Sequence, residues 1–415
     1  MKKTYTKVQV FHLEYVLFYD MILLGEYRFH RERCPMWKRM VLSMLLACLP
    51  WSFCHGESPV PEDMGNLEKA GTALEKQEEK VPWFEIHGDY RWLYGNGRFR
   101  GKSLSLKSRA WKRQDEKVTM ETRRFRLFPV LRLTPHLLLK TALEDNRIDQ
   151  GPGNSHHLFL SRAYLQYENE SLKIEAGRLN YYLMDGDLLD KKMDGFRIRY
   201  GHDDEGPGRS VFFYGRTAED RSKARKVLVL ENKRTLGKWL IHSAYADFRA
   251  IHGHKESIPV LSCFHMPSGK SGERFDRQQV GVVKGAYSPN EDWTFSVDYV
   301  LSHGYHEKDH FSETKPGYVA AAMYGEADPK RVGSYEVWVR YYHLPSSALL
   351  APTMDADTTF FRRMGFSGWG ARLDFVPVKG LVWALEGFSL KNRSSGPVTG
   401  DFHEYVLGTS VTAYF

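Results

Sequence analysis

The sequence predicts an all-β protein, a transmembrane antiparallel up-and-down β-barrel of about 16 strands with long extracellular loops and short periplasmic turns. From Trp83 onward the chain divides into segments in which apolar and polar side chains alternate, which is typical of strands. The connections between these segments are alternately long and short. The last eleven residues (405–415) form an amphipathic strand that ends in Phe415. An open strand edge in lipid would leave backbone groups unpaired, so we expect this strand to close onto the first one.

Composition also favours a barrel over a helical membrane protein. The chain has 415 residues, of which 14% are aromatic, and its mean hydropathy is −0.49. A membrane-spanning helix needs about 20 consecutive apolar residues, and the body of the chain has no such run. A barrel strand needs an apolar side chain only at every second position, so a barrel is polar on average and still spans a membrane.

The residues before the predicted barrel read as an export leader. Lys38 and Arg39 precede an apolar run at 41–53, which is the layout of a signal peptide. A signal anchor and a lipoprotein cleavage box ending at Cys48 are the alternatives. If cleavage falls near Gly56, Cys263 is the one cysteine left, so neither a disulfide framework nor a cysteine-based zinc site is expected, and no cofactor is predicted. The predicted segments are an extension from a start codon placed too early (1–35), a signal peptide (36–56), a flexible periplasmic lead-in (57–81) and the barrel (82–415).

Sixteen strands can be placed on the alternating segments. An even number puts both ends of the barrel in the periplasm, where an exported N-terminus begins. A soluble β-sandwich would also have many strands, but it has no reason to alternate long and short connections. The longest predicted loops include Gly95–Val118 and Ile251–Phe275. The predicted strands are approximately 83–94, 119–133, 137–146, 158–168, 171–180, 193–201, 209–217, 226–234, 237–250, 276–287, 291–303, 317–325, 331–342, 367–377, 380–391 and 402–415.

Alternation within each strand assigns the charged side chains to the inside of the barrel. Arg124 and Arg126, for example, lie on the face opposite Phe125 and Leu127. A cation on the lipid face costs about 2–4 kcal/mol at the bilayer midplane, so the charged face must line the pore. The residues predicted to line it are Arg124, Arg126, Arg132, Lys140, Arg162, Arg178, Arg197, Arg199, Arg340 and Arg372.

The charge balance predicts a preference for anions. The whole chain carries 59 Lys and Arg against 51 Asp and Glu, a net charge of +8. Rings of Arg and Lys in a pore favour anions, and a narrow aqueous tube concentrates their field. The alternative is that many of these arginines pair with carboxylates and only brace the wall.

Four short motifs resemble bacterial outer-membrane porins of the alginate-export type and related porin-like proteins. They are Arg124–Pro129 (RFRLFP), Ser161–Tyr167 (SRAYLQY), Ala176–Arg178 (AGR) and Asp194–Arg197 (DGFR). The resemblance covers about residues 83–415 and implies a water-filled channel for small hydrophilic solutes in the bacterial outer membrane. It also implies contact with outer-membrane lipid, recognition of Phe415 by the barrel-assembly machinery, and a homotrimer. The cations of the first predicted loop could contact lipopolysaccharide phosphates, and a solvated basic loop is the alternative; they are Arg98, Arg100, Lys102, Lys107, Arg109, Lys112 and Arg113. Alginate exporters are understood to have eighteen strands, which differs from the number predicted for this chain.

The third surface loop, 181–192, is predicted to narrow the channel. It resembles in position the loop that folds into the lumen of general porins. Its apolar residues are unusual for a free loop and indicate packing inside the barrel: Leu183, Met184, Leu188 and Leu189. Its acids, Asp185, Asp187 and Asp190, could face the arginine wall and create a transverse field. A calcium site built from them is a weak alternative, because their spacing does not match an EF-hand loop. The loop 343–366 is a second candidate constriction.

Three other functions compete with a diffusion channel. A channel for an acidic polysaccharide such as alginate would use the same arginine-lined lumen. A barrel hydrolase would need a dyad such as Ser302–His303, but neighbours in a strand point to opposite faces, and no catalytic residue is predicted. The remaining candidate histidines are His242, His252, His254, His306 and His310. Nucleic-acid binding would fit the pI near 9.0, yet no nucleic-acid module is visible and the export signal argues against it.

Overall fold

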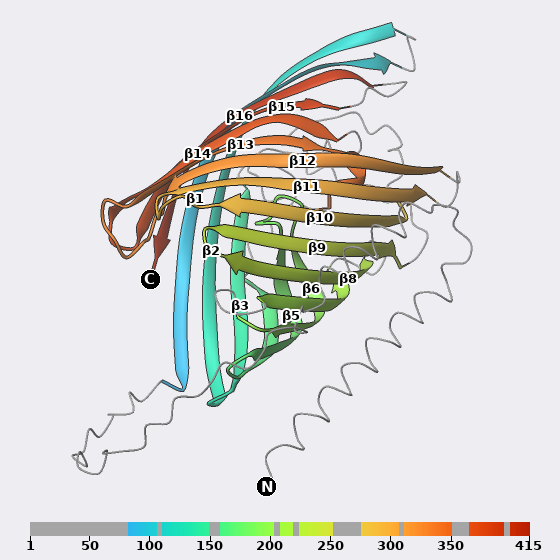
Figure 1. Ribbon diagram of the computed structural model, residues 1–415. Coiled ribbons are helices and arrows are strands. Elements are labelled where there is room, and N and C mark those ends of the chain that lie inside the picture. The colour runs from blue at the N-terminus through green and yellow to red at the C-terminus, as the bar shows by residue number, and fades with distance from the viewer. Residues whose placement is uncertain are drawn as a thin grey trace, which may run out of the picture. The chain divides into compact units, whose positions relative to one another are not determined.

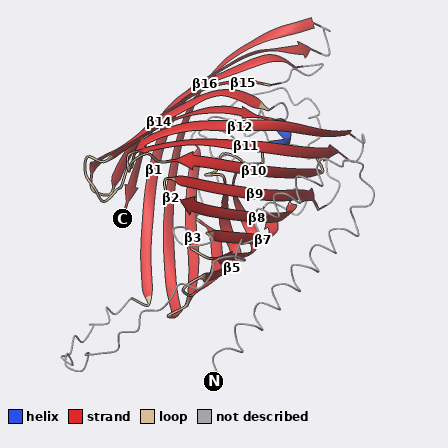
Figure 2. Cartoon of the chain, viewed as in Figure 1, coloured by secondary structure: helices blue, strands red, loops and turns tan. Residues whose placement is uncertain are grey.

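The computed structural model contains one closed antiparallel sheet of sixteen strands, in which each strand pairs with its neighbours in the sequence (Figure 1). The predicted barrel and its strand count are therefore confirmed. Besides strands, the described residues contain one short 3-10 helix, η2 (Ser346–Ala348), seen in Figure 2. None of their helices has the length and apolar character to cross a membrane. The structure describes residues 82–105, 110–148, 158–202, 208–218, 224–251, 275–306, 311–350, 365–393 and 399–415. The predicted leader segments before residue 82 lie outside these ranges.

The strands follow the predicted segments closely except at the loop ends. Their bounds are β1 (Phe84–Ser105), β2 (Ala110–Thr134), β3 (Leu137–Ile148), β4 (Phe159–Glu168), β5 (Leu172–Leu183), β6 (Leu189–Tyr200), β7 (Arg209–Thr217), β8 (Arg225–Leu236), β9 (Trp239–Ala250), β10 (Arg277–Tyr287), β11 (Trp293–His306), β12 (Phe311–Gly325), β13 (Tyr335–Leu344), β14 (Phe366–Val378), β15 (Leu381–Asn392) and β16 (Thr399–Tyr414).

The last strand closes the barrel against the first. The β1–β16 ladder begins at the pair Asp89–Tyr414 and continues along the strands to Ser103–Thr399. Outward-facing side chains of the two strands meet along this seam, as in the pair Asn96–Leu407. The sheet therefore has no free edge among the described strands, as the amphipathic terminal segment predicted.

The prediction of a long loop at residues 95–118 is wrong. Residues 95–118 are mostly strand, because β1 and β2 stay paired without interruption from Gly95–Met120 to Ser105–Ala110. The two strands have 22 and 25 residues, whereas a barrel strand crosses a membrane with about 9–11. Beyond that length the outward face of the hairpin no longer meets lipid, so apolar alternation is not required and the segment resembles a loop in sequence.

The predicted loop 181–192 is also largely a paired hairpin. β5 continues to Leu183 and β6 begins at Leu189, with a turn between them. β4 pairs with β5 only as far as Arg178, and β7 pairs with β6 only from Met193. In the described sheet, residues 179–191 thus have ladder partners only within the hairpin. We call residues 179–191 the inner hairpin, because they leave the barrel wall.

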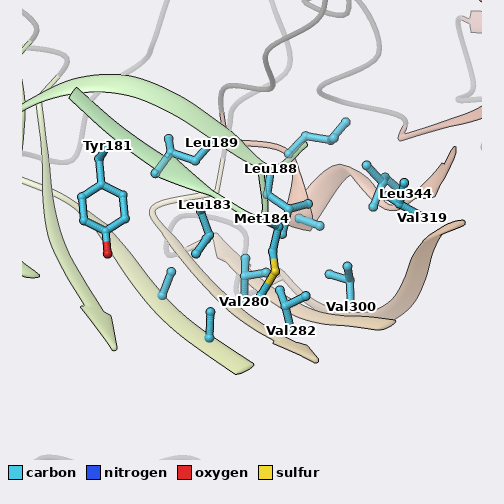
Figure 3. Close-up of a cluster of buried hydrophobic side chains, with 14 of the residues drawn as sticks. Tyr181, Leu183, Met184, Leu188, Leu189, Val280, Val282, Val300, Val319 and Leu344 are labelled. Atoms are coloured by element: carbon cyan, nitrogen blue, oxygen red, sulfur yellow. The ribbon is translucent and has the colours of Figure 1, made fainter. Parts of the chain in front are cut away.

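One face of the inner hairpin packs against apolar side chains inside the barrel. Leu183, Met184 and Leu188 lie over Val280 and Val282 of the wall (Figure 3). The segment around η2 joins the same cluster through buried side chains of its own. The backbone N–H of Leu350 donates a hydrogen bond to the carbonyl oxygen of Leu188, 3.3 Å away. Two surface connections far apart in the sequence therefore meet in the lumen and occupy it together.

Candidate functional site

The other face of the inner hairpin is polar and faces the wall formed by β2–β4. A cavity of about 420 Å³ separates the two surfaces, and we call it the cationic chamber. Six of its lining residues are cations and two are acids. Its lining comprises Arg124, Arg126, Arg162, Arg178, Lys191, Lys192, Glu144, Asp190, Phe159, Ser161, Asn180, Tyr182 and Ala218.

Alternation in β2 and the departure of the hairpin from the wall together supply these cations. Arg124 and Arg126 lie opposite Arg91 and Asp89 in the β1–β2 ladder, on the inward face. Arg178 follows a different route: it is an odd number of residues from the inward Glu175, so simple alternation would place it outside. It reaches the chamber because the chain bends away from β4 at this residue.

Two chamber arginines have no carboxylate partner among the described residues. The Nε of Arg124 is buried and makes no hydrogen bond. Arg162 lies over the ring of Phe128, 5.2 Å from its centroid, and Arg126 stacks on the same ring at the same distance. Arg126 also bonds Asp89, with Nη2 2.7 Å from a carboxylate oxygen. Arg124 and Arg162 therefore present uncompensated charge to the chamber.

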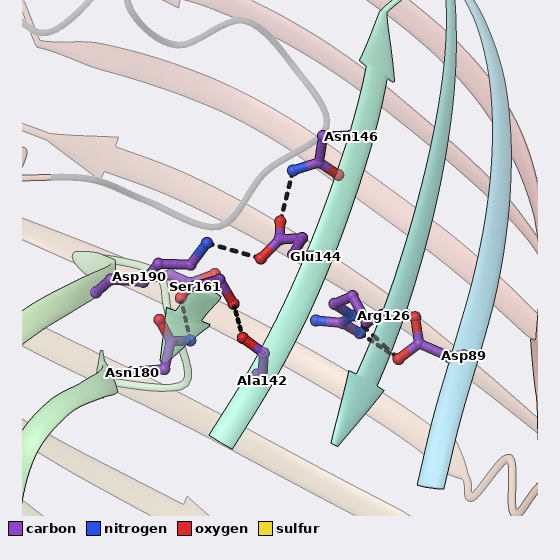
Figure 4. A network of polar contacts seen from close by, with 9 residues as sticks. Asp89, Arg126, Ala142, Glu144, Asn146, Ser161, Asn180 and Asp190 are labelled. Atoms are coloured by element: carbon purple, nitrogen blue, oxygen red, sulfur yellow. Dashed lines mark hydrogen bonds and ion pairs between the residues drawn. The ribbon is translucent and has the colours of Figure 1, made fainter. Parts of the chain in front are cut away.

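Hydrogen bonds fix the polar face of the hairpin across the chamber (Figure 4). The Lys192 ammonium lies 2.7 Å from the Glu144 carboxylate of β3, and Asn146 donates to the same carboxylate at 2.5 Å. Within the hairpin, Asn180 donates to Asp190 at 2.9 Å. Two further acids lie beside the lining, because Arg126 pairs with Asp89 and Arg178 with Asp194, each at 2.7 Å. The six chamber cations still outnumber these four acids, so the net charge around the chamber is positive.

The turn of the inner hairpin is anchored on the far wall. Asp185 accepts from Lys284 of β10 at 2.7 Å, and Lys284 also lies 3.4 Å from Asp298. Asp187 accepts from Arg340 of β13 at 2.5 Å. The three predicted constriction acids thus divide between two walls, with Asp190 alone lining the chamber. The three acids therefore do not act together on one side of the lumen, as the expected transverse field would require.

The other predicted lumen cations lie outside the chamber. Arg197 and Arg199 share the buried Glu175 at 2.5 and 2.7 Å, and Arg372 pairs with Asp374 at 2.7 Å. These three arginines pair with carboxylates of the wall, as the alternative to an anion-selective lining predicted. Arg132 and Lys140 lie near the β2–β3 turn, at the opposite end of those strands from Ile148.

The described lumen cations that sequence reasoning missed include Arg91, Lys284, Lys191 and Lys192. Arg91 lies in a predicted strand and alternates with Asp89, so the pattern could have found it. Lys284 also lies in a predicted strand, but among neutral neighbours. Lys191 and Lys192 fell in a predicted loop, where alternation carries no information about facing.

The predicted alternatives based on histidine and metal chemistry gain no support from the geometry. The Ser302 hydroxyl bonds Ser347 at 2.7 Å, while His303 Nδ1 lies 2.8 Å from the Thr314 hydroxyl, so the two neighbours serve separate contacts. His242 pairs with Glu231 at 2.9 Å. Within the described ranges, no group of three His, Cys, Asp or Glu side chains is arranged to hold a metal ion. The structure does not describe Cys263, His252, His254 or His310, nor the side chain of His306.

Comparisons with known proteins found similarity in structure alone. No protein-family model matches the chain, and no curated protein matches its sequence. Similar solved structures include a loop L8 deletion mutant of OmpT from Vibrio cholerae, which is 12% identical with a TM-score of 0.47 and covers 80% of this chain and 99% of its own. OprB from Pseudomonas putida is 10% identical with a TM-score of 0.48, covering 80% and 94%. A mutant porin of Rhodopseudomonas blastica is 12% identical with a TM-score of 0.42, covering 80% and 100%. At these values the likeness carries nothing about what this chain transports.

Proposed function

We propose that the protein is a bacterial outer-membrane channel for small hydrophilic solutes and that it favours anions. The closed sheet supports the membrane placement, because it satisfies its backbone hydrogen bonds internally, as lipid requires. Its outward face is apolar and aromatic and is strongly exposed at Ile86, Phe295, Val297 and Leu407. A water-soluble protein would rarely expose so much apolar surface.

The cationic chamber is the observation that carries the anion preference. Its six cations outnumber its two acids, and Arg124 and Arg162 have no carboxylate partner in the described chain. Cations that line a water-filled passage attract anions and repel cations, and low-dielectric walls strengthen the field between them. The inner hairpin forces solutes on this side of the lumen past that surface.

Planar-bilayer recordings in salt gradients test the proposal. The wild-type reversal potential should indicate anion preference, and the double variant Arg124→Gln/Arg162→Gln should move it toward non-selectivity. Arg331→Gln is a matched control, because it removes one exposed cation from a turn between β12 and β13. Unchanged selectivity in the double variant would remove the chamber as the filter, and absence of any conductance would overturn the open channel.

A channel for an acidic polysaccharide remains the second candidate, since it would use the same cations. The two functions differ in whether small ions pass freely. Oligo-uronates added to the bilayer should block the current only weakly if the protein is a diffusion channel. Tight block together with little small-ion current would favour the polysaccharide channel. Hydrolysis assays on lipid and peptide substrates test the remaining alternative, a barrel hydrolase.

A further inference from the structure

The cationic chamber also contains two exposed aromatic rings. Tyr182 of the inner hairpin and Phe159 of β4 both line it, with 54% and 44% of their surfaces exposed. Tyr182 lies opposite Asp190 in the β5–β6 ladder, on the polar face of the hairpin. Its neighbour Tyr181 is on the other face and is 1% exposed, because it packs in the apolar cluster of the lumen. The hairpin thus buries one ring and presents the next one to the chamber, where attraction of simple anions requires no apolar surface.

The chamber arginines present the edges of their guanidinium groups. Arg126 and Arg162 each lie over the ring of Phe128, 5.2 Å from its centroid, so this ring covers one face of each group. The N–H groups lie along the edge of a guanidinium, and this edge matches the two oxygens of a carboxylate. Since the described residues supply Arg162 with no carboxylate, its edge can receive one from a solute.

The chamber is poor in hydrogen-bond acceptors that are still unused. Lys192 and Asn146 bond the Glu144 carboxylate at 2.7 and 2.5 Å. Asn180 donates to Asp190 at 2.9 Å (Figure 4). A sugar acid carries several hydroxyl hydrogens that need acceptors, whereas an aromatic carboxylate only accepts hydrogen bonds. The polar groups of the chamber therefore suit an aromatic carboxylate better than a sugar acid.

We infer that the chamber selects small aromatic carboxylates, with the ring of the solute on Tyr182 and its carboxylate at Arg124 and Arg162. The volume of about 420 Å³ is near the lower end of the range for ligand pockets, which suits a solute with a single ring. Aromatic rings attract one another in offset or edge-to-face contacts, beyond the effect of the area they bury. Phe159 offers a second ring, with the Lys192 ammonium 5.3 Å from its centroid. The inference rests on the proposed anion channel and names its solute class.

Block of the chloride current in planar bilayers tests the inference on the full-length protein. Potassium benzoate, acetate and glucuronate are added in turn, and the concentration of each that halves the current is measured. Acetate carries the same charge without a ring, and glucuronate carries it on a sugar. Benzoate should halve the current at a concentration roughly tenfold lower than either, because only its ring buries apolar surface against the chamber rings. Equal block by benzoate and acetate, or tighter block by glucuronate, would overturn the inference.

Variants of Tyr182 test whether its ring makes the contact. Tyr182→Ser should raise the half-blocking concentration of benzoate roughly threefold or more, whereas Tyr182→Phe keeps the ring and should retain the wild-type value. Tyr200→Ser is the matched control, because it removes a ring that is 55% exposed at the opposite end of β6 from the inner hairpin. An unchanged benzoate value in Tyr182→Ser would exclude this ring as the contact and overturn the inference.

The wild-type recordings separate failure of the inference from failure of the proposed function. Reversal potentials in potassium chloride gradients report anion preference without any aromatic solute. An anion-selective channel that does not distinguish benzoate from acetate would overturn the solute class alone. A channel without anion preference would overturn the proposed selectivity, and the solute class with it.

Discussion

The last residue of the chain is bonded to Gly88 at the start of the first strand. The Gly88 N–H donates to the Phe415 carbonyl oxygen at 2.8 Å, and the Phe415 N–H donates back to Gly88 at 3.1 Å. The Phe415 ring lies where a side chain at position 88 would begin, and its centroid is 6.2 Å from that of Phe125. The seam of the barrel is thus held by a backbone pair that an aromatic ring covers on the outside.

This packing predicts that Gly88→Ala destabilises the barrel. A Cβ at position 88 would lie 2.4 Å from the Phe415 ring and 2.9 Å from the carbonyl oxygen of Arg126, so ring and backbone would both have to shift. We expect a loss of about 1–3 kcal/mol, measured by thermal unfolding in detergent. Gly95→Ala is the control in the same strand, because its Cβ would meet nothing closer than 3.7 Å. Equal losses in the two variants would contradict the explanation.

Releasing the turn of the inner hairpin should destabilise the lumen and make the current noisier. Asp187→Asn leaves Arg340 without its carboxylate, and breaking a buried ion pair costs about 3–5 kcal/mol. The measurements are the unfolding midpoint and single-channel fluctuations. Replacing both partners in Asp187→Asn/Arg340→Met should recover part of the stability. The exposed pair of Glu326 and Arg331 is the control, since Glu326→Gln should cost about 1 kcal/mol or less.

Removing the chamber acid of the hairpin should change selectivity in the opposite direction to removing its arginines. Asp190→Asn deletes one of two negative charges in the chamber, so the reversal potential should move toward stronger anion preference. Asp145→Asn makes the same chemical change outside the chamber lining and should leave selectivity as it is. An unchanged reversal potential in Asp190→Asn would show that solutes do not pass this surface, and a shift toward cation preference would contradict the expected electrostatic effect.

The extended β1–β2 hairpin should keep its ion pair in acid. Hydrogen bonds from Arg98 lower the pKa of Asp115 from 3.8 to about 2. Because this pKa is lower in the folded protein than in the unfolded chain, the stabilisation is present above pH 3.8 and is lost as the pH falls through about 2. Carbon-13 titration of the Asp115 carboxyl measures this directly. Arg98→Gln should return the pKa toward 3.8, and an unchanged pKa would exclude Arg98 as the cause.

The wall of the barrel could be predicted from the sequence because lipid on one side and water on the other enforce alternation along each strand. The prediction was wrong at Gly95–Val118, where the same strands leave the membrane. There the outward face no longer meets lipid, so polar residues such as Asn96 and Thr119 occupy positions that would be apolar within the membrane. Alternation of apolar and polar side chains is a signal of lipid on one face, so it cannot identify a strand that extends beyond the membrane.

The candidate site could be predicted only in part, because it depends on contacts between distant segments. The apolar residues of the inner hairpin indicated that it packs inside, and alternation placed Arg124 and Arg126 in the lumen. Arg178 was also predicted to line the lumen, but it does so through a bend of its strand and not through alternation. The alternation pattern also could not show that Asp185 and Asp187 form ion pairs with β10 and β13, whereas Asp190 lines the cationic chamber on the opposite side.

The anchors of the inner hairpin also constrain the order in which the protein folds. Asp187 and Arg340, which form an ion pair, are separated by 153 residues in the sequence. The hydrogen bond between Leu188 and Leu350 likewise joins two distant segments. The hairpin can form from local pairing as soon as β5 and β6 meet, but it has nothing to hold it in place until β13 has joined the sheet. Contacts over such separations form late, because long stretches of chain must be ordered first. The lumen therefore reaches its final width near the end of folding. This happens well after β5 and β6, which form the inner hairpin, have paired.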